Sequence, residues 1–106
     1  MRSLRSKKLK PTHPGEILRE DVLPELSITQ GVLAKALNVS RRTVSQILNE
    51  RRPVTADMAI RLERLLGTPA ETWLNLQREL DLWLLEQDKA KVKEYNEIPQ
   101  LIAVAA

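Results

Sequence analysis

The sequence contains no cysteine and no phenylalanine, only one histidine and only three glycines among 106 residues. Without cysteine there is no disulfide, no thiolate zinc site and no cysteine nucleophile, and a reducing compartment is the natural setting. His13 has no second histidine or cysteine with which to complete a metal site, so it is expected to act as a local cap or surface residue. The glycines are too scattered for a phosphate-binding loop. We therefore expect no catalytic residues, no metal and no cofactor, and a protein that is not an enzyme.

Long apolar runs are also missing, since no stretch approaches the roughly 20 residues that span a bilayer. The basic start of the chain is not followed by the apolar segment of a secretion signal. Hydrophobic residues make up 42% and charged residues 29%, which is typical of a folded soluble domain. We expect no membrane association, and three parts: a basic flexible arm over residues 1–12, one folded domain over 13–90 and a tail over 91–106.

The positive charges are gathered in two segments. Residues 1–10 hold five basic side chains and no acidic one, and residues 27–52 hold five basic side chains against Glu50 alone. Residues 69–98 are acidic overall, with seven acidic side chains against four basic ones. Such a chain can present one surface to a polyphosphate and another to a basic partner, and a solvated mixed surface is the alternative.

The spacing of apolar residues is helical along most of the chain, which predicts an all-α fold. Capping residues, prolines and a glycine divide it into five expected helices. These run from His13 to Pro24, from Thr29 to Asn38, from Ser40 to Asn49, from Thr55 to Gly67 and from Thr68 to Leu85. Pro24 is expected to end the first helix, and Thr68 and Glu71 are expected to form a capping box at the start of the last.

The second and third helices are joined by only three residues, 38–40, which is the geometry of a helix-turn-helix. At about 100° per residue, the third helix turns Val44, Ile47 and Leu48 to one side and a polar face without acidic residues to the other. Side chains of these types suit base edges in a DNA groove. The candidate base-reading residues are Arg41, Arg42, Ser45 and Gln46, and the candidates for phosphate contacts are Gln30, Lys35, Thr43, Asn49, Arg51 and Arg52.

Two parts of this region carry a family resemblance. Residues 29–40 and 43–49 resemble the helix-turn-helix of the phage-repressor (Cro/C1, XRE) class. The segments His13–Leu18, Thr55–Leu62 and Trp73–Trp83 are similar to those of the HigA antitoxin family, also labelled VapI-like. With them the resemblance runs from about residue 11 to residue 84.

The resemblance implies a five-helix, lambda-repressor-like domain with a long C-terminal helix and a short apolar tail. It implies a homodimer that binds double-stranded DNA at a palindromic operator and represses its own operon. It also implies neutralisation of a HigB-type toxin, a small basic endoribonuclease acting on translated messenger RNA. Such a protein is cytoplasmic and associated with the nucleoid.

Carried over by position, Gln30 and Asn49 would each hold a phosphate, and Arg41, Arg42, Ser45 and Gln46 would read bases. Gly31 departs from the family pattern, because repressors of this class usually have a polar or acidic helix former there. Glycine should cost up to about 1 kcal/mol in helix propensity. The two arginines can instead clamp phosphates, in which case specificity would rest on Ser45 and Gln46.

The last helix has apolar residues around more than half of its circumference, so two fronts must be covered. The main face, a candidate dimer or partner surface, contains Trp73, Leu76, Leu80, Trp83 and Leu84, and a second band contains Leu74, Leu82 and Leu85. Either the monomer covers the second band or a two-fold dimer does. The uncharged tail over residues 98–106 is expected to dock on its own domain, on a dimer mate or on a toxin.

Three functions remain open at this level. The first is an antitoxin and autorepressor, and the second is a stand-alone regulator of the same fold without a toxin. The third is a helical adaptor that does not touch DNA. A small basic protein encoded next to the chain would distinguish the first two, and a steep loss of DNA affinity with salt would exclude the third.

Overall fold

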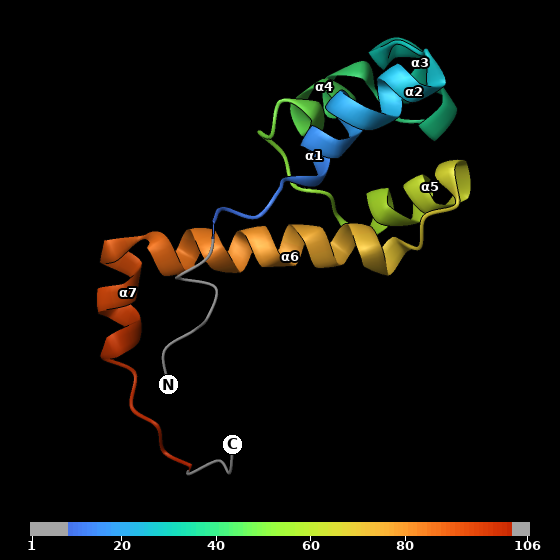
Figure 1. Cartoon of the computed structure of the whole chain (residues 1–106). Helices are drawn as coiled ribbons and strands as arrows, with labels where there is room; N and C mark the ends of the chain where they lie inside the picture. Colours follow the sequence, from blue (N-terminus) through green and yellow to red (C-terminus); the bar gives the residue numbers. More distant parts are fainter. Residues whose placement is uncertain (1–8, 103–106) are drawn as a thin grey trace.

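The computed structural model describes residues 9–102, and all of its regular elements in this range are helices (Figure 1). They are α1 (Pro14–Ile17), η2 (Leu18–Val22), α2 (Leu23–Leu26), α3 (Gln30–Leu37), α4 (Arg41–Leu48), α5 (Ala56–Leu66), α6 (Ala70–Gln87) and α7 (Lys89–Asn96). The all-α prediction is confirmed. The first three elements follow one another without a break, so they correspond to the first of the five predicted helices, and α7 is an addition to them.

The prediction that Pro24 ends the first helix is wrong. Residues 18–22 form a π-helical turn, in which the amide of Leu23 donates to the carbonyl of Leu18. This wider turn restarts the hydrogen-bond register, so Pro24 falls in the first turn of α2, where its missing N–H is not needed. The helix ends instead at Ser27, which adopts a left-handed conformation with φ of 54°.

The predicted caps of the next three helices are confirmed. The side chains of Thr29, Ser40 and Thr55 each accept a hydrogen bond from the backbone amide three residues later, at 3.2, 3.0 and 3.3 Å. Asn38 ends α3 with φ of 57°, and Gly67 ends α5 with φ of 82°. Both are left-handed, as the sequence predicts.

The predicted capping box at the start of α6 is wrong. Pro69 is the N-terminal cap, and no side chain of its own helix caps it. The amide of Ala70 instead donates to the carboxylate of Glu63, on α5, at 2.9 Å. The first turn of α6 is therefore satisfied by the preceding helix, which fixes the corner between α5 and α6.

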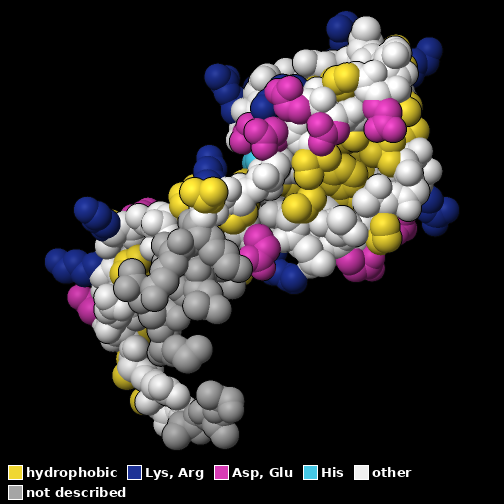
Figure 2. Space-filling model, in the orientation of Figure 1, with side chains coloured by type: hydrophobic (Ala, Val, Ile, Leu, Met, Phe, Trp, Pro, Cys, Tyr) yellow, Lys and Arg dark blue, Asp and Glu magenta, His cyan; other side chains and the backbone are white. Residues whose placement is uncertain are grey.

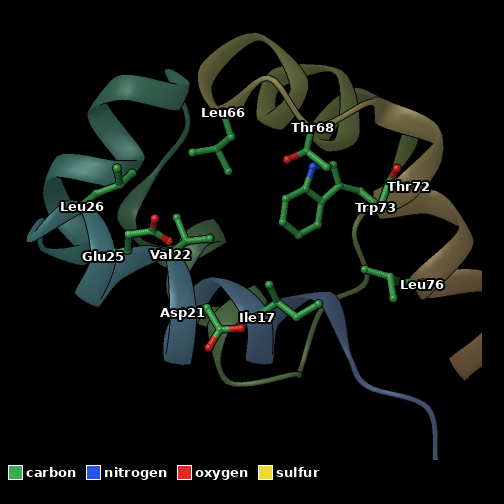
Figure 3. A pocket seen from close by; sticks show the side chains of 10 residues that line it. All are labelled: Ile17, Asp21, Val22, Glu25, Leu26, Leu66, Thr68, Thr72, Trp73 and Leu76. Atoms are coloured by element: carbon green, nitrogen blue, oxygen red, sulfur yellow. The ribbon is translucent and has the colours of Figure 1, made fainter.

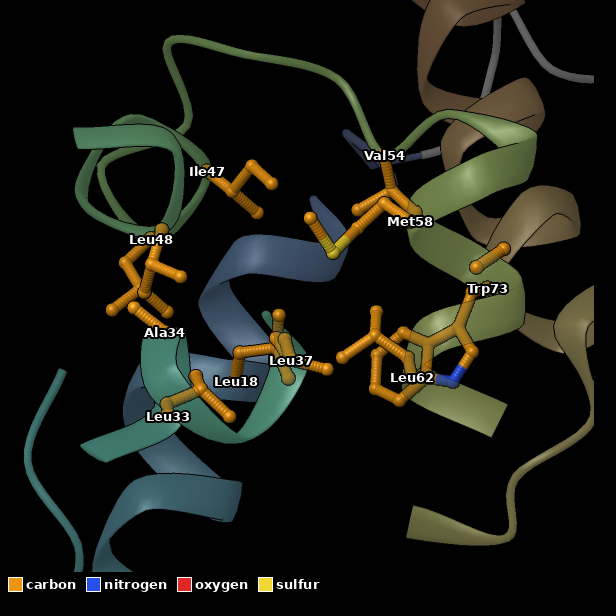
Figure 4. Close-up of a cluster of buried hydrophobic side chains, with 12 residues drawn as sticks. Leu18, Leu33, Ala34, Leu37, Ile47, Leu48, Val54, Met58, Leu62 and Trp73 are labelled. Atoms are coloured by element: carbon orange, nitrogen blue, oxygen red, sulfur yellow. The ribbon is translucent and has the colours of Figure 1, made fainter. Parts of the chain in front are cut away.

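The core lies where η2, α3, α4 and α5 meet (Figure 4). Its buried members are Leu18, Leu33, Ala34, Leu37, Val44, Ile47, Leu48, Val54, Met58, Ala59, Leu62 and Trp73. Trp73 belongs to α6, so the long helix is attached to the core through its N-terminal half. The apolar face predicted for the third helix is confirmed. In the fourth helix Met58, Ala59 and Leu62 are buried, whereas Leu65, which its helical spacing places on the same face, is exposed.

The C-terminal part of α6, α7 and the residues after it extend away from this core. The described residues span 50 × 25 × 22 Å, and Figure 1 shows α6 running beneath the domain with α7 turned across its far end. No residue of α7 is buried, and Ile98, Leu101 and Ile102 are exposed. The described apolar residues of the tail, 98–102, are therefore not buried against their own domain. Residues 1–8 of the predicted arm and 103–106 of the predicted tail lie outside the described residues.

Candidate nucleic-acid interface

Helix α4 presents one apolar and one polar face. Val44, Ile47 and Leu48 are buried in the core, whereas Arg41 and Arg42 are exposed. The remaining residues of the polar face, Ser45 and Gln46, are half-buried, and Asn49 is exposed just beyond the helix. All the predicted base-reading side chains therefore lie on the outer side of the helix, where they can reach a ligand.

The turn between α3 and α4 is held by an arginine of α5. The Nη1 atom of Arg61 donates to the carbonyl of Leu37 at 3.0 Å and to the carbonyl of Asn38 at 3.4 Å, and its Nε donates to Asp57 at 2.8 Å. These bonds satisfy carbonyls that the end of α3 leaves unpaired. Sequence reasoning missed this role, because Asp57 and Arg61 read as an ordinary surface pair four residues apart.

The other end of α4 is held by Arg19 of the π-helical turn. Its Nη1 donates to the carbonyl of Leu48 and lies 3.3 Å from a carboxylate oxygen of Glu50. Its Nε donates to Glu20 at 2.9 Å. Glu50 is the one acidic residue between positions 27 and 52. Pairing with Arg19 therefore neutralises the charge that would otherwise repel phosphates from this surface.

The predicted phosphate-binding residues surround α4 on both sides. Gln30 begins α3 and Lys35 follows on the same helix, while Arg51 and Arg52 lie in the loop after α4, and all four are exposed. The Nη1 atom of Arg52 donates to Thr43 Oγ1 at 3.2 Å, which ties this loop to the first turn of α4. The sixth candidate, Asn49, donates to Ser45 Oγ at 3.4 Å. These six residues, on α3, on or just after α4 and in the following loop, are called the rim residues below.

Gly31 leaves room for the side chain of Arg41. A Cβ atom at position 31 would lie 3.3 Å from Arg41 Nε, 3.4 Å from Cζ and 3.5 Å from Nη2. The guanidinium group therefore lies across the first turn of α3. This contact gives the unusual glycine a structural reason that the sequence alone does not show.

A buried polar contact joins the loop after α4 to α6. Gln77 is buried, its Oε1 accepts from the amide of Val54 at 2.9 Å, and its Nε2 donates to Asp81 at 2.9 Å. Sequence reasoning did not find this role, because a glutamine on a long amphipathic helix reads as a solvated residue. The contact holds the basic loop that contains Arg51 and Arg52 against the long helix.

His13 caps the first helix from a buried position. Its Nδ1 accepts a hydrogen bond from the amide of Gly15 at 2.8 Å, as the prediction of a local cap requires. Burial lowers the pKa of its imidazole, because the charged ring would lose hydration, and the carboxylates of Glu50 and Asp81 only partly oppose this shift. The ring also lies beside the backbone of Arg52, so the cap of α1 and the basic loop are neighbours.

The candidate dimer or partner residues of α6 divide into inner and outer groups. Trp73 and Leu80 are buried within the chain, Leu76 and Trp83 are partly buried, and Leu84 is exposed. The surface left for a second chain therefore lies toward the C-terminal half of the helix.

Known proteins are similar to this chain both in amino-acid sequence and in the arrangement of their helices. A helix-turn-helix family profile matches residues 18–73. Antitoxin HigA-1 of Vibrio cholerae serotype O1 is 41% identical over 80 residues, which cover 76% of this chain and 75% of the relative. The chain belongs to the HigA antitoxin family of helix-turn-helix proteins.

Two further comparisons agree with this assignment. Virulence-associated protein I of Dichelobacter nodosus is 48% identical over 80 residues, covering 76% of the HigA-family chain described here and 74% of the relative. The structure of Pseudomonas aeruginosa antitoxin HigA with the higBA promoter has 47% sequence identity and a TM-score of 0.76. It covers 87% of this HigA-family chain and 99% of its own. That antitoxin was therefore solved on DNA with the same helical arrangement.

The HigA family is one of DNA-binding regulators and antitoxins, not a family of enzymes. Within residues 9–102 no group of histidine and carboxylate side chains is placed to hold a metal ion. None of the helices in that range is both long and apolar enough to cross a membrane.

Proposed function

We propose that the chain is an operator-binding antitoxin that represses its own operon and neutralises a HigB-type messenger RNA endoribonuclease. We further propose that it works in the cytoplasm, on the nucleoid, and has no enzymatic activity of its own. The observation that carries the DNA-binding part is the exposed, acid-free polar face of α4, fixed at one end by Arg61 and at the other by Arg19.

The roles of the individual side chains follow from their positions. A helix of this kind enters the major groove with its polar face toward the base edges. Arginine can donate two hydrogen bonds to guanine and glutamine can pair with adenine, so we assign base reading to Arg42 and Gln46, with Arg41 and Ser45 beside them. The rim residues Gln30, Lys35, Thr43, Asn49, Arg51 and Arg52 are assigned to phosphates.

The same proposal includes a homodimer on a palindromic operator. Leu84 and Leu85 on α6 and the apolar residues after α7 are exposed, which a stable monomer would rarely allow in such number. Two-fold symmetry would place the two α4 helices about 34 Å apart, one turn of DNA. Both polar faces would then meet equivalent half-sites of an inverted repeat.

The test compares three proteins on two DNAs. The wild type, Gln46→Ala and Arg52→Ala are titrated by fluorescence anisotropy onto the upstream operator and onto random DNA, each at several salt concentrations. Gln46→Ala should weaken operator binding by about 1–3 kcal/mol and leave random DNA almost unaffected. Arg52→Ala should weaken both DNAs similarly and reduce the salt dependence by about one phosphate contact.

Two results would contradict the proposal. If Gln46→Ala and Arg52→Ala lose the same affinity on both DNAs, the division into base-reading and phosphate-binding residues is wrong. If the wild-type chain binds no DNA at low salt, the autorepressor function is wrong. Co-expression with the neighbouring reading frame separately tests the antitoxin part, since a regulator without a toxin partner would purify alone.

A further inference from the structure

A groove lies outside the DNA-facing surface (Figure 3). It runs between the first helical stretch, formed by α1, η2 and α2, and the corner where α5 meets α6. It has a volume of about 410 Å³. Its lining residues are Ile17, Asp21, Val22, Glu25, Leu26, Leu66, Thr68, Thr72, Trp73 and Leu76. None of them belongs to α3 or α4, so an occupant of the groove would leave the polar face of α4 uncovered.

The groove combines an apolar floor with an acidic edge. Figure 2 shows apolar side chains gathered in a hollow of the surface, with carboxylates beside them. In Figure 3, Ile17, Val22 and Leu66 point toward one another across the space, and Asp21 and Glu25 lie along one side. Neither carboxylate forms an ion pair with any residue in the described range. The edge therefore carries two negative charges available to a partner.

The wall opposite the first helical stretch contains an incompletely bonded tryptophan. Trp73 is only 3% exposed, and its indole Nε1 is buried without an acceptor among residues 9–102. Figure 3 shows its ring forming the wall of the groove, with the nitrogen on the side of Thr68. A buried donor without an acceptor costs about 1–3 kcal/mol, so this wall is not optimised for the isolated chain.

We propose that this groove binds the toxin, through an apolar side chain of the toxin flanked by lysine or arginine. The apolar side chain would lie on the floor formed by Ile17, Val22 and Leu66, and the basic residues would pair with Asp21 and Glu25. The inference rests on the proposed antitoxin function and names the surface that performs it. The two carboxylates exclude DNA as the occupant, because they repel phosphates.

A second copy of the chain is a poorer match for the groove. The apolar tail from Ile98 to Ile102 contains no charged residue, so it offers nothing to pair with the acidic edge. A basic protein with apolar anchors satisfies both the floor and the edge, and complementary charge also speeds its association. Because the groove and α4 share no residue, the complex of the two proteins can bind the operator.

The test uses two variants of the full-length antitoxin, each with a matched control. Leu26→Asp alters an apolar lining residue of the groove, and Ile60→Asp is its control, because the two side chains are 48% and 51% exposed and Ile60 lies outside the groove. Glu25→Lys alters the acidic edge, and Glu97→Lys, an exposed position beyond α7, is its control. All four substituted positions are exposed, so the fold should be retained.

The measurement is calorimetric titration with a catalytically inactive form of the toxin encoded beside this chain. Leu26→Asp and Glu25→Lys should each weaken toxin binding about tenfold or more, while both controls remain close to the wild type. Operator affinity and the mass of the free antitoxin should be unchanged in all four. In a ¹H–¹⁵N spectrum, toxin should shift the indole signal of Trp73, assigned with the help of Trp83→Phe.

The possible failures are distinguishable. If wild-type antitoxin does not bind the toxin at all, the antitoxin function and the groove proposal both fail. If the wild type binds but both groove variants bind equally well, the function stands and the groove is wrong. If Leu26→Asp lowers the mass of the free antitoxin, the groove is a contact between copies of this chain, which also overturns the proposal.

Discussion

Gly31 shows how the absence of one side chain shapes the DNA-facing surface. Glycine weakens a helix by up to about 1 kcal/mol relative to alanine, so its presence in α3 has a stability cost. The guanidinium group of Arg41 lies against this position, 3.3–3.5 Å from where a Cβ atom would stand. Glycine at this position therefore lowers the stability of α3 but allows the Arg41 cation to lie at the edge of the polar face.

Replacing this glycine should separate stability from DNA binding. Gly31→Ala should raise the free energy of unfolding by up to about 1 kcal/mol, as measured by urea denaturation. It should also weaken operator binding slightly, because the new methyl group would shift the guanidinium group of Arg41 that now lies against position 31. In an Arg41→Ala background, Gly31→Ala should leave operator affinity unchanged. An equal loss of affinity in both backgrounds would show that Gly31 does not act through Arg41.

His13 gives the fold a dependence on pH. Its Nδ1 must be unprotonated to accept from Gly15, and burial already lowers the pKa of the ring. The unfolded chain, with the usual histidine pKa of about 6.5, therefore binds a proton at higher pH than the folded chain. The free energy of unfolding should be greatest above that value and should fall as the pH drops from about 7.5 to about 5.5.

Urea unfolding across this pH range measures the effect. His13→Asn retains an acceptor at the cap but removes the titrating ring, so its stability should vary less with pH than that of the wild type. The same slope in both proteins would assign the pH dependence to the carboxylates instead.

The sequence predicts residues well where their role is local. The caps at Thr29, Ser40 and Thr55 and the polar face of α4 depend on neighbours within one or two turns, and their side chains lie as expected. The residues that hold α4 in place act over long distances. Arg61 reaches Leu37, 24 positions away, and no local pattern distinguishes it from a solvated arginine.

At the scale of elements, α4 is positioned by a close approach to the first helix. A Cβ atom at Gly15 would lie only 1.8 Å from the backbone carbonyl oxygen of Ile47. Only a residue without a side chain allows the two helices to approach so closely. This contact sets the distance between α1 and the helix that carries the base-reading residues.

Gly15→Ala should therefore be destabilising, although alanine is the better helix former. A backbone oxygen cannot move aside as a flexible side chain can, so the two helices must separate. Overpacking of this kind typically costs about 1–3 kcal/mol, which urea denaturation detects. Gly31→Ala is the matched control, since it is the same substitution in another helix and should have the opposite sign. A Gly15→Ala variant as stable as the wild type would contradict this account of the α1–α4 contact.

The two errors of prediction also belong to this scale. Pro24 was expected to end a helix because proline removes an amide donor, but a π-helical turn shifts the register before it. Thr68 was expected to cap α6 from within, but Glu63 of the preceding helix supplies the acceptor. In both cases the backbone groups at the start of a helix are satisfied by hydrogen bonds other than the expected ones. The sequence pattern does not show which set of hydrogen bonds forms.

At the scale of the whole molecule, the chain has two unequal parts: the helix-turn-helix domain, and α7 with the residues that follow it. The helix-turn-helix part has a closed core, whereas α7 contacts the end of α6 without burying any of its residues, and Ile98, Leu101 and Ile102 after it are exposed. The sequence predicts that the tail must be covered but leaves its partner open. Because the groove lined by α1, η2, α2 and the α5–α6 corner is proposed to bind the toxin, we expect a second copy of the chain to cover the tail.

Deleting residues 96–106 should weaken the dimer. The deletion removes Ile98, Leu101 and Ile102, and burying each of these side chains fully would contribute about 1.5–3 kcal/mol at most. Sedimentation velocity at decreasing concentration should therefore show dissociation of the truncated chain where the full chain still sediments as a dimer. Ile60→Asp, which alters an exposed apolar residue far from the tail in sequence, serves as the control and should not change the mass.

The truncation also separates dimer formation from toxin binding. Operator binding should weaken, because two linked α4 helices bind an inverted repeat far more tightly than one. The affinity of each chain for the toxin should remain, because the groove is formed by residues between Ile17 and Leu76. Loss of toxin binding with an unchanged dimer mass would place the tail on the toxin and show that the two parts of the molecule have been assigned to the wrong partners.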